Sequence, residues 1–444
     1  MRPYRSRQHR VLQCERVTRS GVAVHSHAGR RWCSLVLAGL VLCCPCLGAD
    51  LAAEPAPVAF KAPYVPTSDD EILQDVPSTA DPAVVAMRAL RSALDANPKD
   101  FGAARELANA YIDYSRQVGD AHYAGYAEAV IAPWLTQPAP PADALVTQAV
   151  IMQYRHQFSE ARGLLQRALK IDGRNAQAWL TLATLDMVQG DYDAAAKDCI
   201  RVSNDAAVDT GLGCFGSLRS YTGQARQSLT LLHQLEMSAA HAPPSYKAWV
   251  EGMLAESEER LGDWTMAEKY YRSALLLQPQ DNFLLVAYAD FLLDRSRPRE
   301  VLPLLADHIQ SDTAFLRLAL AEAAIHGVAA QRYTWIMSAR FEALRLRGSD
   351  YFGREESRFA LQLQHDPQTA LEMALLNWQV QRAPWDARVV LEAALAANKP
   401  QAAVATLDFL EKTKLEDPIL SPMVKNLRAQ LAATGAGQAD EPSP

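Results

Sequence analysis

The sequence predicts an all-α fold in which helical hairpins stack side by side as a solenoid. The first observation is a phrase that recurs with apolar and small residues at the same offsets, HQFSEARGLLQRALKIDG at 156–173, QGDYDAAAKDC at 189–199 and GDWTMAEKYYRSALLLQP at 262–279. The second is the period, since one small residue of the phrase recurs after 34, 33, 39 and 34 residues, at Ala161, Ala195, Ser228, Ala267 and Val301. A fixed period near 34 residues is typical of a solenoid whose unit is one helical hairpin.

Each unit is expected to hold two amphipathic helices, because apolar residues recur within it every three or four positions. The break between the two helices contains a glycine in three units, at Gly190, Gly223 and Gly262. Glycine suits this place because a helix end often takes a left-handed conformation that other residues resist. The small residue lets the two helices approach closely, and Pro279 ends the second helix of its unit.

These residues resemble the tetratricopeptide repeat family, whose 34-residue pattern is W-x2-L-G-x2-Y, then A-x3-F, then P. Trp179, Leu182 and Ala183 match the first helix of that pattern, and Ala195 matches the second. The resemblance implies a right-handed superhelix of helical hairpins.

A later unit matches the pattern in its second helix, through Ala267, Tyr271 and Pro279. The sequence departs from the pattern at Asp186, where an aromatic residue is usual, and at Gln148, where leucine is usual. The best repeats are expected at 142–175, 176–208, 209–244 and 248–281.

The whole chain is expected to divide into four parts. Residues 1–49 are interpreted as a cleavable signal peptide with an over-long N-terminus, because Arg30-Arg31 precedes an apolar run that ends in Gly48-Ala49. An uncleaved membrane anchor is the alternative. The other parts are a proline-rich linker, a solenoid with degenerate repeats on both sides of the best ones, and a disordered tail, at 50–81, 82–433 and 434–444.

The charge of the chain argues against nucleic acid as a partner. The formal net charge is −7, but residues 1–49 carry eight arginines and one acidic residue, so the remainder carries about −14. Nucleic-acid phosphates and anionic lipid head groups would repel such a body. We therefore expect no nucleic-acid partner. From the expected signal peptide we also expect a periplasmic location, with no membrane insertion after the signal is cleaved.

Motifs for catalysis are lacking. HExxH, GxSxG and a P-loop are absent, and the glycines of GLGCFG at 211–216 do not open a strand–turn–helix unit. Glu256, Glu258 and Glu259 come nearest to a carboxylate pair, but their spacing on a helix is that of a solvated surface. We therefore expect no enzyme activity, no cofactor and no metal.

Cys199 and Cys214 are the two cysteines beyond the first 49 residues. They lie symmetrically about an expected turn between two antiparallel helices, so they would face each other. Gly211, Gly213 and Gly216 would let the backbones approach within the distance that a disulfide requires, and an exported location would supply the oxidant. The alternative is that both are buried thiols, and the sequence does not decide between the two.

The resemblance also implies a concave groove that binds a segment of a partner protein and is lined by the first helix of each unit. Carried onto this sequence, the expected groove residues are Gln177, Leu180, Thr184, Trp249, Gly252, Glu256, Phe283 and Val286. Trp249 and Phe283 are the strongest of these, because exposed aromatic side chains supply much of the binding energy at interfaces. We therefore expect a non-enzymatic scaffold or adaptor of the bacterial cell envelope. The alternatives are a subunit of a secretion or exopolysaccharide-export machine, and a helical-array enzyme or sugar-chain-handling protein.

Overall fold

The computed structural model describes residues 81–205, 208–346 and 353–438, which belong to one compact unit. The expected signal peptide and linker lie outside these residues, apart from Asp81. Residues 434–438, which were expected to begin a disordered tail, instead continue the last helix, which ends at Gln438. Among the described residues, no helix is long and apolar enough to cross a membrane.

The described residues form twenty α-helices and contain no β-strand, which confirms the all-α class predicted from the sequence. Two short 3-10 helices, Ala239–His241 and Pro400–Ala403, follow α9 and precede α19. The α-helices are α1 (Pro82–Ala96), α2 (Phe101–Val118), α3 (His122–Leu135), α4 (Ala142–Tyr154), α5 (Phe158–Ile171), α6 (Ala176–Gln189), α7 (Tyr192–Asp205), α8 (Val208–Ser220), α9 (Ala225–Ser238), α10 (Pro244–Leu261), α11 (Trp264–Leu277), α12 (Asn282–Asp294), α13 (Pro298–Leu305), α14 (Asp312–Ala324), α15 (Ala330–Leu346), α16 (Gly353–Gln362), α17 (Pro367–Val380), α18 (Pro384–Ala396), α19 (Val404–Thr413) and α20 (Leu420–Gln438).

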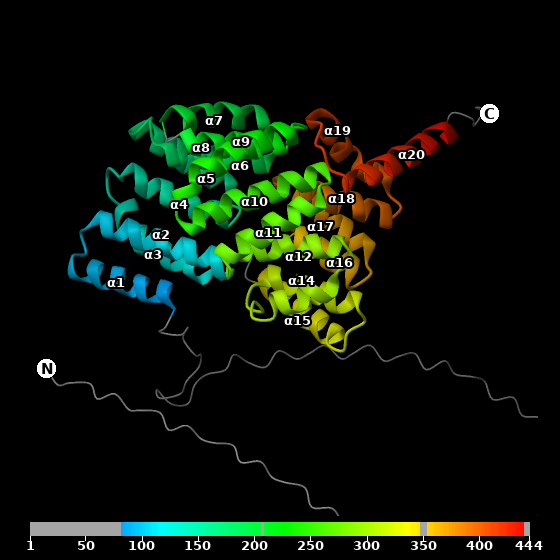
Figure 1. Ribbon diagram of the computed structural model, residues 1–444, viewed down its shortest axis with the longest axis horizontal. Helices are drawn as coiled ribbons and strands as arrows, with labels where there is room; N and C mark the ends of the chain where they lie inside the picture. The colour runs from blue at the N-terminus through cyan, green and yellow to red at the C-terminus, as the bar shows by residue number, and fades with distance from the viewer. Residues whose placement is uncertain (1–80, 206–207, 347–352, 439–444) are drawn as a thin grey trace, which may run out of the picture. The chain divides into compact units, whose positions relative to one another are not determined.

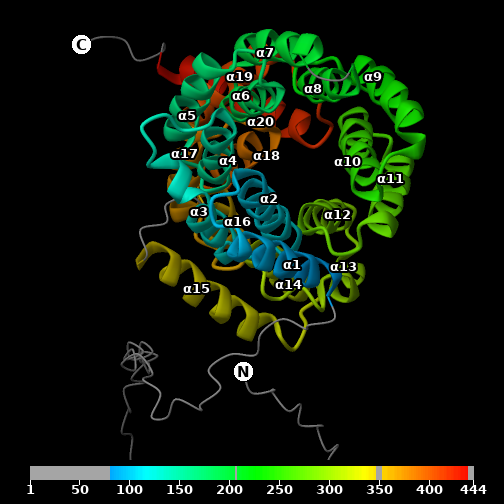
Figure 2. The ribbon, with the colours of Figure 1, turned by 90° about the vertical axis from the view of Figure 1, so that its left-hand side faces the viewer.

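From α2 onward the helices pack as consecutive pairs, α2 with α3, α4 with α5, and so on to α18 with α19 (Figure 1). The first helix of most pairs also packs against the first helix of the next pair. Figure 2 shows α4, α6, α8 and α10 on the inner side of a curved stack and α5, α7, α9 and α11 on its outer side. We call the surface formed by the first helices the inner face.

Burial differs between the two kinds of helix. The second helix α5 is buried at Phe158, Ala161, Leu165 and Ala168, spaced by three or four residues, so only one stripe of it meets the core. The first helix α14 is buried at every position from 314 to 321, so neighbours cover it on several sides. First helices therefore carry the contacts that hold successive pairs together.

Glycines shape the connections as the sequence predicts. The backbone is left-handed at three of them, with φ of +76° at Gly190, +67° at Gly223 and +76° at Gly262. A fourth glycine serves close packing, because a Cβ on Gly216 would lie 2.5 Å from the Leu232 side chain. Helices α8 and α9 can therefore approach closely only because residue 216 has no side chain.

Segments far apart in the chain also touch, so the later pairs lie against the earlier ones. The Arg382 amide, between α17 and α18, donates to the Val188 carbonyl of α6 at 2.7 Å. The Ala225 amide donates to the Glu416 carboxylate, 191 residues later, at 2.9 Å. At the end of α2, a Cβ on Gly119 would lie 2.6 Å from the Ser311 hydroxyl oxygen. Later parts of the chain consequently cover the ends of α2 and α6 and the start of α9.

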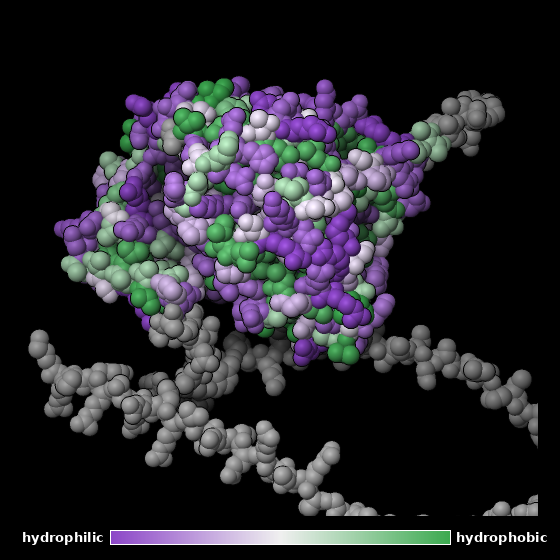
Figure 3. Space-filling model, viewed as in Figure 1, coloured by the Kyte–Doolittle hydropathy of each residue, from purple (hydrophilic) through white to green (hydrophobic). Residues whose placement is uncertain are grey.

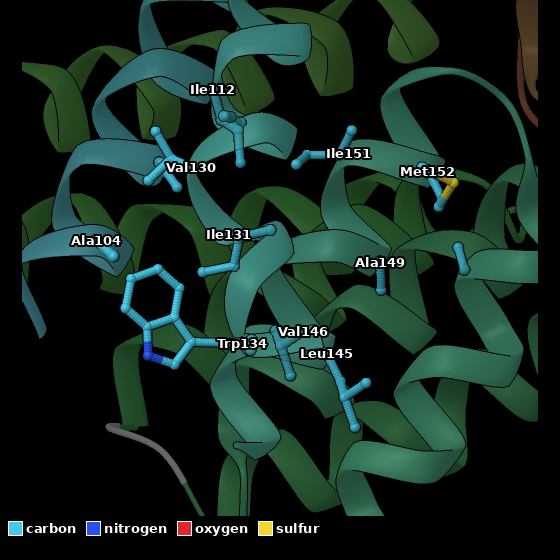
Figure 4. Packing of buried hydrophobic residues seen from close by; sticks show 14 of the residues in the cluster. Ala104, Ile112, Val130, Ile131, Trp134, Leu145, Val146, Ala149, Ile151 and Met152 are labelled. Atoms are coloured by element: carbon cyan, nitrogen blue, oxygen red, sulfur yellow. The ribbon is translucent and has the colours of Figure 1, made fainter. Parts of the chain in front are cut away.

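The core beneath the first pairs is apolar and continuous from α1 to α6. Figure 4 shows Ile131 and Trp134 of α3 among side chains of α2 and α4, including Ile112 and Val146. The Trp134 ring lies 5.8 Å from the Phe101 ring, measured between centroids. This packing fixes the relative positions of α2 and α4, which carry the candidate site.

Candidate functional site

A groove of about 650 Å³ lies on the inner face of α2, α4 and α6. One face of α2 supplies much of its lining, since Arg105, Asn109, Asp113 and Arg116 recur every three or four residues along that helix. The opposite side of α2 is buried, which explains why the polar side chains point into the groove. Ile112, Val146 and Val150 add apolar surface, so the groove offers both polar and apolar contacts.

An ion pair joins two of the three helices within the groove. Arg105 of α2 pairs with the Asp143 carboxylate of α4, and the Asn175 amide donates to the same carboxylate at 2.9 Å. Arg105 and Asp143 therefore bind each other and stabilise the wall of the groove. Asn109 has no side-chain hydrogen bond to any other described residue, so its amide can both donate and accept.

Asp113 is the carboxylate in the groove whose titration is most affected by its surroundings. Burial raises its pKa, and the charge of Arg116, three residues later on the same helix face, lowers it in part. The Asp113 side chain is exposed to solvent, yet protein atoms surround it inside the concave groove. These atoms reduce its hydration, which is enough to raise the pKa.

Of the groove residues predicted from the sequence, Gln177 lines this groove. Its amide donates to the Thr181 hydroxyl at 3.3 Å. Leu180 and Thr184 follow on the same helix and are half-buried, with the Thr184 hydroxyl donating to the Leu180 carbonyl at 2.9 Å. Of these three residues, Gln177 lines the groove and the other two do not, since Leu180 packs against the cluster that contains Cys199 and Cys214. Their role in binding a partner stays a prediction.

The predicted aromatic residues lie elsewhere on the inner helices. Trp249 of α10 is 41% exposed and Phe283 of α12 is 62% exposed. The Trp249 ring covers residue 213 of α8, where a Cβ would lie only 2.4 Å from the ring. Neither aromatic side chain lines the groove over α2, α4 and α6.

Two other predicted residues, Val286 and Gly252, have little free surface. Val286 is half-buried, and Gly252 is buried against α12, with the Leu284 side chain 2.9 Å from the position of a Cβ. They serve the packing of α10 against α12 and offer little to a partner.

The glutamates of α10 are enclosed, so the expectation of a solvated acidic surface was wrong. Glu258 is 7% exposed, and burial raises the pKa of Glu256. Burial also raises the pKa of Glu259 to about 8, and the Tyr271 hydroxyl donates to its carboxylate at 3.0 Å. Sequence spacing cannot reveal this, because the covering residues come from the far end of the chain, where Asp417 pairs with Arg260 at 2.9 Å.

Further along the inner face, buried ion pairs fill the space that a partner would need. Asp290 of α12 accepts hydrogen bonds from Arg317 of α14 at 2.8 Å and from Arg358 of α16 at 2.8 Å. All three side chains are almost fully buried. Although burial alone would raise it, the two guanidinium groups hold the pKa of Asp290 below its usual value.

This network continues toward α18. Arg388 forms two hydrogen bonds of 2.7 Å with the Asp294 carboxylate of α12. The guanidinium groups of Arg388 and Arg358 lie 4.4 Å and 4.9 Å from the centroid of the Trp385 ring. Among the described residues, the inner face is therefore open at α2, α4 and α6, and closed where these ion pairs join α12, α14, α16 and α18.

The two cysteines after residue 49 face each other. Cys199 of α7 and Cys214 of α8 have Cα atoms 5.6 Å apart, and the structure joins their sulfur atoms as a disulfide. Both side chains are buried. Whether the bond forms in the protein in its native compartment stays a prediction.

Sequence reasoning missed the four α2 residues of the groove, Arg105, Asn109, Asp113 and Arg116. The signal was present, because these four polar residues recur every three or four positions, while buried residues such as Leu107 and Tyr114 lie on the other side of the helix. Across the described part of the chain, no group of three or more His, Cys, Asp or Glu residues could hold a metal ion.

Comparisons with known proteins agree with this architecture in one segment. A family model described as tetratricopeptide repeat matches residues 154–209, which include α5, α6 and α7. Comparison with curated proteins gives no match.

Solved structures with a similar helical arrangement include the Cut9–Hcn1 hetero-tetramer of APC/C, with 11% identity, a TM-score of 0.40, and coverage of 78% of this chain and 52% of that one. The chain thus spans about half the length of that protein. PilW, a widely conserved type IV pilus biogenesis factor, has 16% identity and a TM-score of 0.37, with coverage of 45% and 94%. Yeast Tom70 has 18% identity and a TM-score of 0.34, with coverage of 72% and 59%.

Proposed function

We propose that this tetratricopeptide-repeat protein is a non-enzymatic scaffold that holds a segment of a partner protein in the groove over α2, α4 and α6. Helical repeats of this kind generally mediate protein–protein interaction. The observation that carries the proposal is the combination of volume and free polar groups in this groove, about 650 Å³ with the unpaired Asn109 amide at its wall.

The chemistry of the lining suits an extended peptide. Backbone N–H and C=O groups of an extended segment need both donors and acceptors, and the amides of Asn109 and Gln177 supply both. Val150, which is half-buried at the groove, can contact an apolar side chain of such a segment. Among the described residues from α12 to α18, buried ion pairs join the inner helices, which favours the N-terminal pairs as the place for a partner.

The location in the cell envelope is part of the same proposal. It rests on the apolar run at 32–49 after Arg30-Arg31 in the sequence and on the pairing of Cys199 with Cys214. Disulfides persist in oxidising compartments such as the periplasm. Cleavage between the apolar run and the solenoid would be read by N-terminal sequencing of the protein from its native host.

Photocrosslinking in the native host tests the groove. A photoreactive amino acid at Asn109 is expected to capture one dominant protein, and the same group at Lys197, exposed on the outer side of α7, is the control. Capture from Trp249 as well would extend the partner's path along the inner face. Equal labelling from Asn109 and Lys197, or no adduct from Asn109, would contradict a groove-bound partner.

A further inference from the structure

A second cleft, of about 680 Å³, lies on the outer side of the stack, between α11 and the turn that joins α12 to α13. Four cationic side chains and one carboxylate line it, Lys269, Arg272, Arg295, Arg297 and Glu268. The chain as a whole carries a net charge of −7, so this cleft is a local exception in sign. It shares no residue with the groove over α2, α4 and α6.

Two of the four cations form ion pairs with Glu268, and both also pair with Glu300 outside the cleft lining, Arg297 at 2.6 Å and Arg272 at 3.7 Å. Arg297 pairs with Glu268 at 2.7 Å, and Arg272 pairs with the same carboxylate at 2.7 Å. Hydrogen bonds from Arg297 lower the pKa of Glu268 to about 2, so the carboxylate stays ionised. These contacts build one wall of the cleft and leave Lys269 and Arg295 without a carboxylate.

Arg295 is held in place by an aromatic ring. Its guanidinium carbon lies 3.8 Å from the centroid of the Trp264 ring, the arrangement of a cation–π contact. Its Nε atom is buried and has no hydrogen-bond partner among the described residues. No described carboxylate lies within ion-pair distance of it, so a fixed positive charge with unused donors faces the cleft.

Lys269 adds a second free charge on α11. It is exposed and forms no ion pair with a described residue, and its ammonium nitrogen lies 5.9 Å from the centroid of the neighbouring Tyr270 ring. A carboxylate between Lys269 and Arg295 would offset part of the positive charge of the cleft and pair with these two cations.

Apolar surface accompanies these charges. Leu276 is 85% exposed at the cleft, and Trp264 and Phe291 also line it. Figure 3 shows hydrophilic side chains over most of the face that carries α11 and α12, with hydrophobic ones scattered between them. The apolar surface of the cleft is therefore local and lies beside the charged side chains, and is not part of a large hydrophobic patch.

We propose that this cleft is a second protein-binding site, which takes an acidic segment of a partner with a carboxylate placed beside a large apolar side chain. The carboxylate binds Arg295 and Lys269, and the apolar side chain contacts Leu276 and Trp264. Charge complementarity supports this occupant, since the cleft is cationic in an acidic protein. The protein would then hold two partners, or two parts of one partner, on opposite sides of the stack.

Fluorescence polarisation with labelled peptides tests this site on the full chain. The probes are eight-residue peptides in which two aspartates flank Leu or Phe, and their counterparts with asparagine in place of aspartate. The acidic probes are expected to bind, to bind more weakly as salt is raised, and to bind roughly tenfold more weakly to Arg295→Gln and to Lys269→Gln, because each variant loses one charge-assisted contact. Arg299→Gln, which removes an exposed arginine of α13 outside the cleft, is the matched control and should bind as the unaltered chain does.

Equal binding of the acidic and asparagine probes, or unchanged binding by both Arg295→Gln and Lys269→Gln, would overturn the proposal. No binding of any acidic probe would overturn it as well. Displacement of the probe by polygalacturonate but not by polyglutamate would assign the cleft to an acidic polysaccharide instead. Asn109→Ala should leave probe binding unchanged, which separates this site from the groove over α2, α4 and α6.

Discussion

The inner face of the stack has two regions that use polar side chains in opposite ways. At α2, α4 and α6 they line a groove with space for another molecule, and the Asn109 side chain has no hydrogen bond to any residue that the structure describes. From α12 to α18 they bind one another across the interior, with Asp290 held by two arginines. The inner face of a helical pair can therefore be open to a partner or covered by the chain itself. The presence of polar side chains alone does not distinguish these two cases.

Removal of a charge should show the largest difference between the two regions. Asp290→Asn removes the carboxylate that both Arg317 and Arg358 bind, leaving Glu355, 3.6 Å from Arg317, as the nearby buried counter-charge. The change is expected to cost about 3–5 kcal/mol in the free energy of unfolding. The matched variant Asp113→Asn, in the open groove, should change it by less than about 0.5 kcal/mol. Urea unfolding followed by circular dichroism measures both, and equal losses would contradict the assignment of open and closed regions.

The disulfide lies between the two regions along the chain, so its loss should affect stability without changing the contrast between them. A closed loop of this size, with a sequence separation of 15, is expected to contribute about 3 kcal/mol. The double variant Cys199→Ser, Cys214→Ser should therefore unfold at a lower urea concentration, and dithiothreitol should have the same effect on the unaltered chain. Reductant that leaves the unfolding midpoint unchanged would show that the two thiols are free.

Stability should depend on pH through Glu259, which lies on α10, between the two regions along the chain. Burial raises its pKa from 4.5 to about 8, so the folded state binds a proton that the unfolded state releases. This contribution to stability is fully present below pH 4.5 and declines as the pH rises to about 8, by up to about 1 kcal/mol per pH unit. Urea unfolding from pH 5 to pH 8 measures the free energy of unfolding of the unaltered chain and of Glu259→Gln. The advantage of the unaltered chain over the variant should shrink or reverse as the pH rises. A difference that stays constant over this range would show that Glu259 is ionised throughout.

A smaller effect is expected at the border between the regions, where Trp249 covers Gly213. Gly213→Ala places a methyl group 2.4 Å from the Trp249 ring and should displace it, at a cost of about 1 kcal/mol. Gly163→Ala, in a helix where nothing lies within 4 Å of the new methyl group, should instead stabilise the protein by about 0.5–1 kcal/mol. Stabilisation by both changes would mean that Trp249 does not pack on α8.

Much of the fold follows from the sequence because its determinants are local. The period near 34 residues, the alanines at hairpin contacts and the glycines at the breaks act within one unit and its neighbour, and the helices appear where this pattern places them. Burial of one side of α2 likewise directs the polar side chains of its other side into the groove. Helical spacing in the sequence is therefore enough to predict the open region.

The closed region could not be predicted, because its contacts join distant parts of the chain. Asp290 and Arg358 are 68 residues apart, and Asp294 and Arg388 are 94 apart. Nothing in the spacing around Glu256 indicates that the chain near Asp417 returns to cover it. How far the solenoid winds back onto itself depends on the summed geometry of many pairs, which local patterns do not determine.

Thiol labelling resolved by peptide mass spectrometry tests the contrast between open and closed inner faces most directly. Asn109→Cys places a thiol in the groove, and Ser357→Cys places one at a buried position of α16 that is 1% exposed. We expect a maleimide to label residue 109 as fast as in the unfolded chain, and more slowly once the partner found by photocrosslinking is added. Residue 357 should be labelled only after unfolding. Protection of residue 109 without a partner, or rapid labelling of residue 357 in the folded chain, would contradict it.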